Sequence, residues 1–207
     1  MRKSAKRQHI MRNAEALFSS KRFHEITLDD VALAAQVGKG TIYRYFENKE
    51  DLYTQTVVAG LNELRDLLDR KVSESAPFRD QLLVVCREIS EFYQSRRSLF
   101  RMMQAEEIRL SGSRGRQHSA WIEHGKEILS IVEKVLQDGV KEGSVRGDIP
   151  PGVLGSFLLG MIRTRVRSLG SIPEDLREYE VLVDLFLMGA SGSKKPFNNA
   201  VGPGNYD

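Results

Sequence analysis

The sequence predicts an all-α protein of about nine helices, with an N-terminal three-helix helix-turn-helix domain and a C-terminal helical bundle. Apolar residues recur at the three- and four-residue spacing of an amphipathic helix, as Ile10, Ala14, Leu17 and Phe18 do. No run of β-branched residues alternates with polar ones, which is the pattern that would indicate strands. No segment repeats with a period of roughly 20–50 residues, so a solenoid is not expected.

The helical pattern can be followed along the chain as far as residue 190. Pro150 and Pro151 separate the last two helices from the others. Residues 191–207 are rich in Gly, Ser, Asn and Pro, so we expect a disordered tail there. We divide the chain into a helix-turn-helix domain over 1–48, a second helical domain over 49–190 and the tail. The expected helices cover residues 10–18, 28–35, 39–45, 49–72, 82–93, 99–108, 121 to 139 or 143, 153–169 and 179–188.

The composition is that of a soluble globular protein with a basic N-terminal part. Of the 207 residues, 41% are hydrophobic and 29% are charged, which allows a core and excludes a disordered polymer. Residues 1–50 hold ten Lys or Arg against six Asp or Glu, a surplus that favours a polyanionic partner. The basic N-terminus lacks the apolar segment of a signal peptide, and no apolar stretch could span a membrane. We therefore expect a cytoplasmic protein.

Catalytic motifs are missing from the sequence. The four histidines do not have the H-E-x-x-H spacing, and the single cysteine, Cys86, cannot form a multi-thiolate zinc site. The chain contains no P-loop, no dinucleotide-binding glycine motif and no nucleophile elbow. We expect neither an enzyme nor a bound cofactor or metal.

A helix start is encoded at residues 26–31. Thr27 can cap the helix and Asp30, three residues later, completes a capping box, while Ile26 can pack on Val31. A break at residues 36–38 and a second short helix follow. Two short helices joined by a three-residue turn are typical of a helix-turn-helix, which binds DNA in the major groove.

The second of these helices has one apolar and one polar face. At about 100° per residue, Ile42 and Phe46 share one side, while Gly40, Thr41 and Arg44 lie opposite. Arginine can donate two hydrogen bonds to guanine, and threonine can contact a base edge. This face therefore fits a major groove, the alternative being an ordinary solvated helix surface. Tyr43 and Tyr45 flank this face on either side, where the phosphates that border a DNA groove would lie.

Lys49 stands at the expected start of the next helix, where a cation opposes the helix dipole. Asn48 and Asp51 are the expected caps. A lysine at this position is explained if a phosphate binds the helix N-terminus. The alternative is that Glu50 and Asp51 simply neutralise it.

Residues 8–53 resemble the DNA-binding domain of the tetracycline-repressor (TetR/AcrR) family. The run K-G-T-I-Y-R-Y-F over 39–46 and the following N-K-E-D-L carry most of this resemblance. It implies a homodimeric transcriptional regulator, usually a repressor, that binds a palindromic operator in double-stranded DNA and responds to a small-molecule effector. Alternatives are an activator, a regulator without an effector or, less favoured, a non-specific DNA-packaging protein. Further matching residues are Phe18, Thr27, Val31, Ala32, Ala35, Val37 and Leu52.

The resemblance also implies roles for individual residues. The residues that would face bases are Lys39, Gly40, Thr41 and Arg44. The residues that would bind phosphates are Thr27, Tyr43, Tyr45 and Lys49. A basic arm against the DNA backbone or minor groove would comprise Arg2, Lys3, Lys6 and Arg7.

Three positions depart from the family pattern. Glycine is usual after the first helix and in the turn, where this chain has Arg22 and Gln36. If either backbone is left-handed, a residue other than glycine costs about 1–2 kcal/mol there. Gly38 replaces a usual serine or threonine and removes one phosphate contact.

The second domain is predicted to bind the effector and to dimerise. Ligand pockets in bundles lie between helices, and dimers of such chains often form a four-helix bundle. For both sets the alternative is plain intrachain core. The pocket candidates are Cys86, Ile89, Phe92, Tyr93, Phe100, Met103, Trp121 and Ile122. The dimer-interface candidates, in the last two helices, are Gly155, Phe157, Leu158, Gly160, Met161, Leu182, Leu185 and Phe186.

Overall fold

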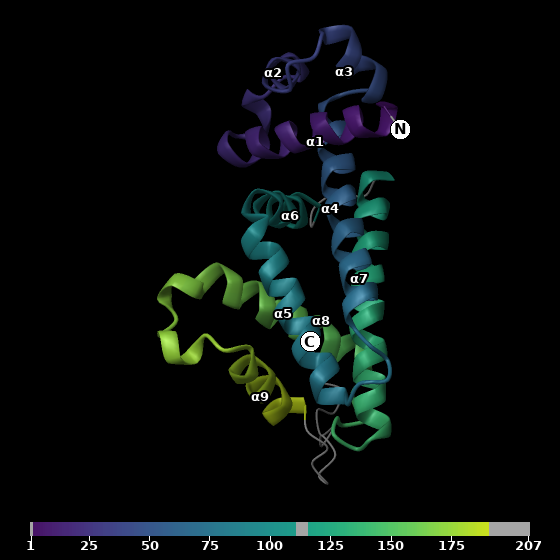
Figure 1. Ribbon diagram of the computed structural model, residues 1–207, viewed down its shortest axis with the longest axis vertical. Coiled ribbons are helices and arrows are strands. Elements are labelled where there is room, and N and C mark those ends of the chain that lie inside the picture. Colours follow the sequence, from purple (N-terminus) through teal and green to yellow (C-terminus); the bar gives the residue numbers. More distant parts are fainter. Residues whose placement is uncertain (1, 111–115, 191–207) are drawn as a thin grey trace, which may run out of the picture. The chain divides into compact units, whose positions relative to one another are not determined.

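The computed structural model describes the backbone of residues 2–110 and 116–190 and the side chains of residues 4–105 and 125–190. This part of the chain is all-α, as predicted, and contains nine α-helices and three short 3₁₀ helices (Figure 1). The predicted disordered tail lies outside the described residues. The α-helices are α1 Arg2–Ser20, α2 Leu28–Ala34, α3 Lys39–Tyr45, α4 Lys49–Lys71, α5 Phe78–Ser95, α6 Arg97–Leu110, α7 Arg116–Lys141, α8 Pro151–Ser168 and α9 Tyr179–Ala190.

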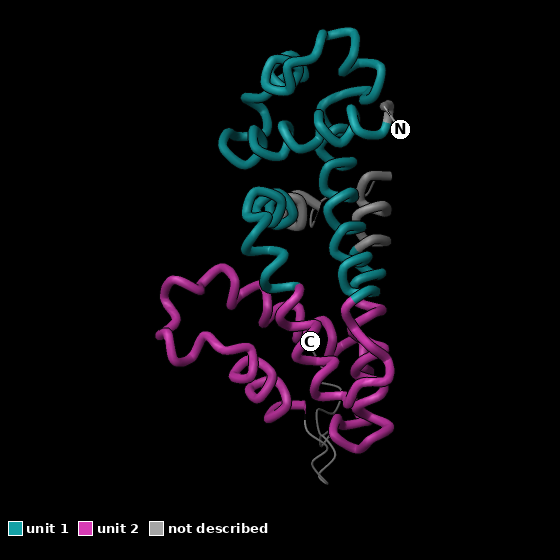
Figure 2. The backbone as a smooth tube through the Cα atoms, viewed as in Figure 1, with its two compact units in different colours: residues 1–70, 89–128 teal, residues 71–88, 129–207 magenta. Residues whose placement is uncertain are grey.

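The helices form two compact units, coloured separately in Figure 2. Unit 1 comprises residues 1–70 and 89–128, and unit 2 comprises residues 71–88 and 129–207. The chain therefore changes unit inside α4, α5 and α7. The division into functional domains at residues 48 and 190 is a different one and stays a prediction. Among the described residues, no helix combines the length and apolarity that crossing a membrane requires.

The core of unit 1 is built from the apolar faces that the sequence predicted. Ile10 and Ala14 of α1, Val31 of α2 and Ile42 of α3 are fully buried. Aromatic rings extend this core, since Phe18 lies 5.0 Å from the ring of Tyr53 in an edge-to-face arrangement. Burying these apolar side chains contributes about 1.5–3 kcal/mol for each large one.

Unit 1 also contains a close helix contact that requires glycine. Gly60 of α4 lies against Leu99 of α6, and a Cβ at residue 60 would overlap the Leu99 side chain. Nearby, the Tyr53 hydroxyl donates a hydrogen bond of 2.8 Å to the Met102 carbonyl of α6. The buried hydroxyl is thereby satisfied, which removes the penalty of an unpaired polar group.

Unit 2 contains α8, α9 and the C-terminal half of α7. Pro151 opens α8, where its missing N–H leaves no intrahelical bond unmade. Gly155 packs on Leu129 of α7, since a Cβ there would lie 2.9 Å from Leu129 Cδ1. An ion pair of 2.7 Å between Arg79 Nη2 and Asp184 Oδ1 joins α5 to α9.

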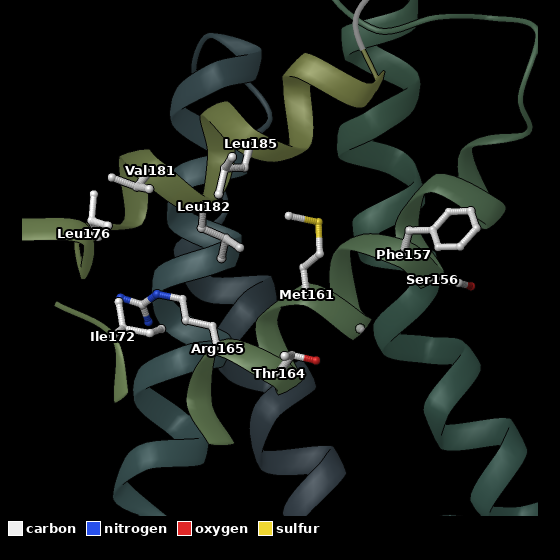
Figure 3. A pocket seen from close by; sticks show the side chains of 11 residues that line it. Ser156, Phe157, Met161, Thr164, Arg165, Ile172, Leu176, Val181, Leu182 and Leu185 are labelled. Carbon is white, nitrogen blue, oxygen red and sulfur yellow. The ribbon is translucent and has the colours of Figure 1, made fainter. Parts of the chain in front are cut away.

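A groove of about 660 Å³ lies in unit 2, lined by α8, α9 and the segment between them (Figure 3). Its lining is apolar, with Phe157, Met161 and Leu185 among the residues. Arg165 stands at its edge and is 8% exposed. The Arg165 guanidinium donates to the Arg177 carbonyl and lies 4.5 Å from the Tyr179 ring, so it fixes the segment that connects the two helices.

Candidate DNA-binding site

The predicted capping box opens α2. Thr27 Oγ1 accepts a hydrogen bond of 3.2 Å from the Asp30 backbone N–H, and the Thr27 N–H donates to Asp30 Oδ2 at 2.8 Å. The pKa of the Asp30 carboxyl is lowered, chiefly because the Thr27 hydroxyl donates a hydrogen bond of 2.7 Å to Oδ2 and further because the Thr27 N–H donates to the same oxygen. Ile26 and Val31 on either side are buried. Thr27, a predicted phosphate-binding residue, is therefore held rigidly at an exposed helix start.

The turn between α2 and α3 contains a left-handed residue. Gln36 has φ 52°, the only positive φ at a residue other than glycine in the described part of the chain. The glycine expected at this position would adopt it freely, so Gln36 is strained. The other departure has no such consequence, because Arg22 has φ −68° and ψ 144°, an extended backbone.

Helix α3 places its residues as the periodicity predicted. Ile42 is fully buried and Phe46, just after the helix, is 1% exposed. Gly40 and Arg44 are exposed and Thr41 is half-buried. A Cβ at Gly40 would meet nothing within 4 Å, so intramolecular packing does not require glycine there. The open space at Gly40 is compatible with close approach of an external surface.

Aromatic side chains border this face. Tyr43 is 57% exposed, and the Arg44 guanidinium lies 5.4 Å from the centre of the Tyr45 ring. A cation over an aromatic face gains about 0.5–1 kcal/mol at an exposed site. This contact holds the exposed Arg44 side chain against the Tyr45 ring of the same helix, and the side chain can leave the ring to contact an external partner.

Lys39, a predicted base-reading residue, is bound to α2. Its Nζ lies 2.6 Å from Asp29 Oδ2. The hydrogen bond that Lys39 donates to Asp29, reinforced by the charge of that carboxylate, raises the pKa of Lys39 above its ordinary value. Periodicity within α3 gave no sign of this partner, which only the packing of α2 on α3 brings close.

Lys49 also has an intramolecular contact that the sequence analysis did not predict. Its Nζ donates a hydrogen bond of 2.8 Å to the Phe23 carbonyl and lies 4.4 Å from the centre of the Phe23 ring. The predicted caps of α4 are confirmed, since the Asp51 N–H donates to Asn48 Oδ1 at 2.8 Å. An ammonium has three hydrogens, so Lys49 retains donors for a phosphate.

The residues suggested as a basic arm lie in the first helix. α1 begins at Arg2, and Lys6 and Arg7 fall in its second turn. The Arg7 Nε donates a hydrogen bond of 3.1 Å to Gln55 Oε1 of α4. Arg7 thus connects α1 to α4 within unit 1.

The predicted effector-site residues are divided between the units. Cys86 belongs to unit 2, whereas Ile89, Phe92, Tyr93, Phe100 and Met103 belong to unit 1. Of these six side chains, all but the half-buried Phe92 are buried. The side chains of Trp121 and Ile122 lie outside the described residues. The groove in unit 2 is lined by other residues.

The predicted dimer residues fall into two groups. Gly155, Leu158, Leu182 and Phe186 are buried within unit 2 itself. Phe157 and Leu185 are 65% and 59% exposed, and Gly160 and Met161 line the groove beside them. Val153 and Met188 add to the exposed apolar surface of the same two helices. Among the described side chains, no cluster of three potential metal ligands is found.

The sequence of the helix-turn-helix matches a known family. Residues 10–56 match the family described as bacterial regulatory proteins, tetR family. The N-terminal domain of the chain therefore belongs to the TetR family. A TetR-family protein of this kind is a DNA-binding transcriptional regulator. A relative, the HTH-type transcriptional regulator YhgD of Bacillus subtilis, is 28% identical over 137 residues, which are 66% of this chain and 70% of that protein.

Solved structures of bacterial regulators share this all-α fold over most of the chain. The fatty acid degradation regulator FadR from Bacillus halodurans has a TM-score of 0.76 at 20% identity and covers 89% of this chain and 95% of its own. FadR from Bacillus subtilis, solved in complex with stearoyl-CoA, has a TM-score of 0.73 at 21% identity, with coverages of 90% and 98%. At such identities the similarity concerns the TetR fold.

Proposed function

We propose that this TetR-family protein is a homodimeric, cytoplasmic repressor that binds an inverted-repeat operator and is released from it by a small-molecule effector. The observation that carries the proposal is the division of α3 into two faces. Ile42 and Phe46 are buried, while Gly40 and Arg44 are exposed on the opposite side. A short helix with one free polar face, following a tight turn, fits a major groove.

Base recognition is assigned to Lys39, Gly40, Thr41 and Arg44. Arg44 supplies the strongest discrimination, because its guanidinium can donate to guanine O6 and N7 together. Gly40 lets the helix backbone approach the bases, and the half-buried Thr41 offers a methyl and a hydroxyl group.

Phosphate binding is assigned to Thr27, Tyr43, Tyr45 and Lys49. Thr27 stands at the start of α2 and Lys49 at the start of α4. Backbone N–H groups at helix starts favour anions, so these two residues lie where phosphates bind well. Tyr43 and Tyr45 would hold the register of α3 without reading sequence.

Dimerisation is assigned to α8 and α9. The exposed Phe157 and Leu185, with Gly160 and Met161, form an apolar surface that favours burial against a second copy. The buried Gly155, Leu158, Leu182 and Phe186 would support this surface from within unit 2. Two helices from each chain would make a four-helix interface.

The effector is proposed to act by population shift. A ligand that binds better to the free protein than to the DNA-bound one changes the separation of the two recognition helices, which must match half-sites about 34 Å apart. Long-chain acyl-CoA is the class to test first, since FadR from Bacillus subtilis was solved with stearoyl-CoA. The proposed pocket is lined by the apolar candidates of unit 1, Ile89, Phe92, Tyr93, Phe100 and Met103.

The test is selection from a pool of random DNA duplexes at a fixed salt concentration near 0.15 M. We expect enrichment of an inverted repeat, and release of that duplex when stearoyl-CoA is added. Arg44→Ala should weaken binding to the selected site by about 1–3 kcal/mol and leave binding to scrambled DNA unchanged. Binding without enrichment of any sequence would instead indicate a packaging protein.

A further inference from the structure

The ion pair between Asp29 and Lys39 joins the two helices of the helix-turn-helix at the surface that is proposed to face DNA. Asp29 is the second residue of α2, and Lys39 is the first residue of α3. The Nζ–Oδ2 distance is 2.6 Å, and the side chains are 72% exposed for Lys39 and 44% exposed for Asp29. The second carboxylate oxygen, Oδ1, is buried and has no hydrogen-bond partner among the described residues. Among the described residues, the Asp29 carboxylate therefore binds Lys39 through Oδ2.

The positions of the two charges explain why they pair. A carboxylate in the first turn of α2 is favoured by the dipole of that helix, so Asp29 is well placed without Lys39. A cation in the first turn of α3 is disfavoured by its own helix. Asp29 compensates for this, and the raised pKa of Lys39 reflects the same attraction. The ammonium is thus directed toward α2.

We infer that Asp29 is a specificity-determining positioning residue, which holds Lys39 so that it reads an operator base and does not bind the phosphates of arbitrary DNA. This inference rests on the proposed function of α3. A lysine without a partner has a long, flexible side chain and binds phosphate as a point charge. Bound to Asp29, it uses one of three hydrogens there and keeps two for a base acceptor at a fixed place. The opposite charges of Asp29 and Lys39 cancel, so the pair does not add to the electrostatic attraction between the protein and non-operator DNA.

The expected size of the effect follows from counterion release. Each phosphate contact adds about −0.9 to the slope of log K against log salt. At 0.15 M salt this corresponds to about a fivefold gain in affinity for each protomer that acquires one contact. Freeing Lys39 should therefore tighten binding to any duplex and reduce the preference for the operator.

The experiment compares the full-length wild type with Asp29→Asn, which keeps the size of the side chain and removes its charge. Affinity is measured by fluorescence anisotropy for the selected duplex and for a scrambled duplex of equal length, at four salt concentrations. We expect Asp29→Asn to bind the scrambled duplex about fivefold more tightly per protomer, with a slope steeper by about 0.9 per protomer. The ratio of the two affinities should fall by a similar factor. Glu47→Gln, an exposed carboxylate of the same domain, is the control for loss of one charge.

Two further variants, Lys39→Met and Asp29→Asn/Lys39→Met, complete a double-mutant cycle. If Asp29 acts through Lys39, Asp29→Asn has no more effect than Glu47→Gln once Lys39 is methionine. An equal gain in both backgrounds would overturn the inference, because it would mean that Asp29 merely repels DNA. Thermal melting of each variant verifies that it is folded. If the wild type selects no sequence, the proposed function fails, whereas the scrambled-duplex cycle still decides whether Asp29 restrains Lys39.

Discussion

The Glu15 carboxylate of α1 binds the Arg96 guanidinium between α5 and α6, with Oε2 at 2.7 Å from Nη2. Glu15 is only 7% exposed, and its other oxygen accepts a hydrogen bond of 3.1 Å from the Leu99 backbone N–H in the first turn of α6. Arg96 also pairs with Glu63 of α4. Glu15 and Arg96 thus connect α1, α4 and α6 within unit 1, and the Glu15 carboxylate is a buried charge.

Arg96→Met is expected to lower the free energy of unfolding by about 3 kcal/mol, because it leaves the Glu15 carboxylate buried without its cation. This loss is at the low end of the range of about 3–5 kcal/mol for breaking a buried ion pair, because the Arg96 side chain is 29% exposed and the pair is therefore partly solvated. Urea denaturation followed by circular dichroism measures the change. The exposed neighbour Arg97→Met should change stability by less than about 0.5 kcal/mol. Adding Glu15→Gln to Arg96→Met should recover part of the loss; no recovery would argue against the buried-charge explanation.

Gln36→Gly should stabilise the protein by about 0.5–1 kcal/mol. Glycine removes the strain of φ 52° at this position, which outweighs its greater freedom in the unfolded chain. The control is Ala34→Gly at the end of α2, where glycine should destabilise by roughly the same amount. Midpoints of urea unfolding distinguish the two. A less stable Gln36→Gly variant would show that the turn does not store this strain.

Lys49→Met should have two measurable effects. Loss of the hydrogen bond to the Phe23 carbonyl and of the contact with the Phe23 ring is expected to lower stability by about 1 kcal/mol. Loss of a phosphate contact should make the salt dependence of DNA binding shallower by about 0.9 per protomer. The matched control, Lys71→Met at the other end of α4, should leave the salt slope unchanged. A stability loss with an unchanged slope would assign Lys49 a structural role alone.

The local features of the site could be predicted from the sequence because neighbouring residues determine them. The capping box of Thr27 and Asp30 and the glycine before α3 defined the helix limits to within one residue. Periodicity alone predicted that Ile42 and Phe46 are buried. The departure from the family pattern marked Arg22 and Gln36 alike as positions where a left-handed backbone would be costly, and the structure has that backbone at Gln36 and not at Arg22.

Contacts between distant residues could not be predicted in the same way. Lys39 and Lys49 had been assigned to DNA, and the structure adds Asp29 and Phe23 as intramolecular partners. Periodicity shows that a helix face is apolar and does not show what covers it. Phe186, for example, is buried within unit 2, whereas Leu185 beside it is 59% exposed.

Leu185→Lys and Phe157→Lys are each expected to convert a dimer to a folded monomer. A charge in the exposed apolar surface of α8 and α9 costs little in the free chain but is unfavourable once a second copy covers it. Multi-angle light scattering gives the mass, and circular dichroism verifies that the helices remain. Leu33→Lys, at an apolar residue of α2 that is 80% exposed, should stay dimeric. If both variants of α8 and α9 remain dimeric, the interface lies elsewhere.

Cys86 should make stability fall at alkaline pH. Burial raises the pKa of the Cys86 thiol to about 12, against a smaller opposing effect of Arg165. Below pH 9 the thiol is neutral in both the folded and the unfolded chain, so its contribution to stability is fully present. Between pH 9 and 12 the unfolded thiol ionises first, and stability falls by up to about 1.4 kcal/mol per pH unit. Urea unfolding from pH 8 to 11 should therefore show a steeper decline for the wild type than for Cys86→Ala, in which other groups titrate unchanged. Parallel declines would mean that the thiol is accessible in the folded protein, and Ellman's reagent would then react with it at pH 8 without denaturant.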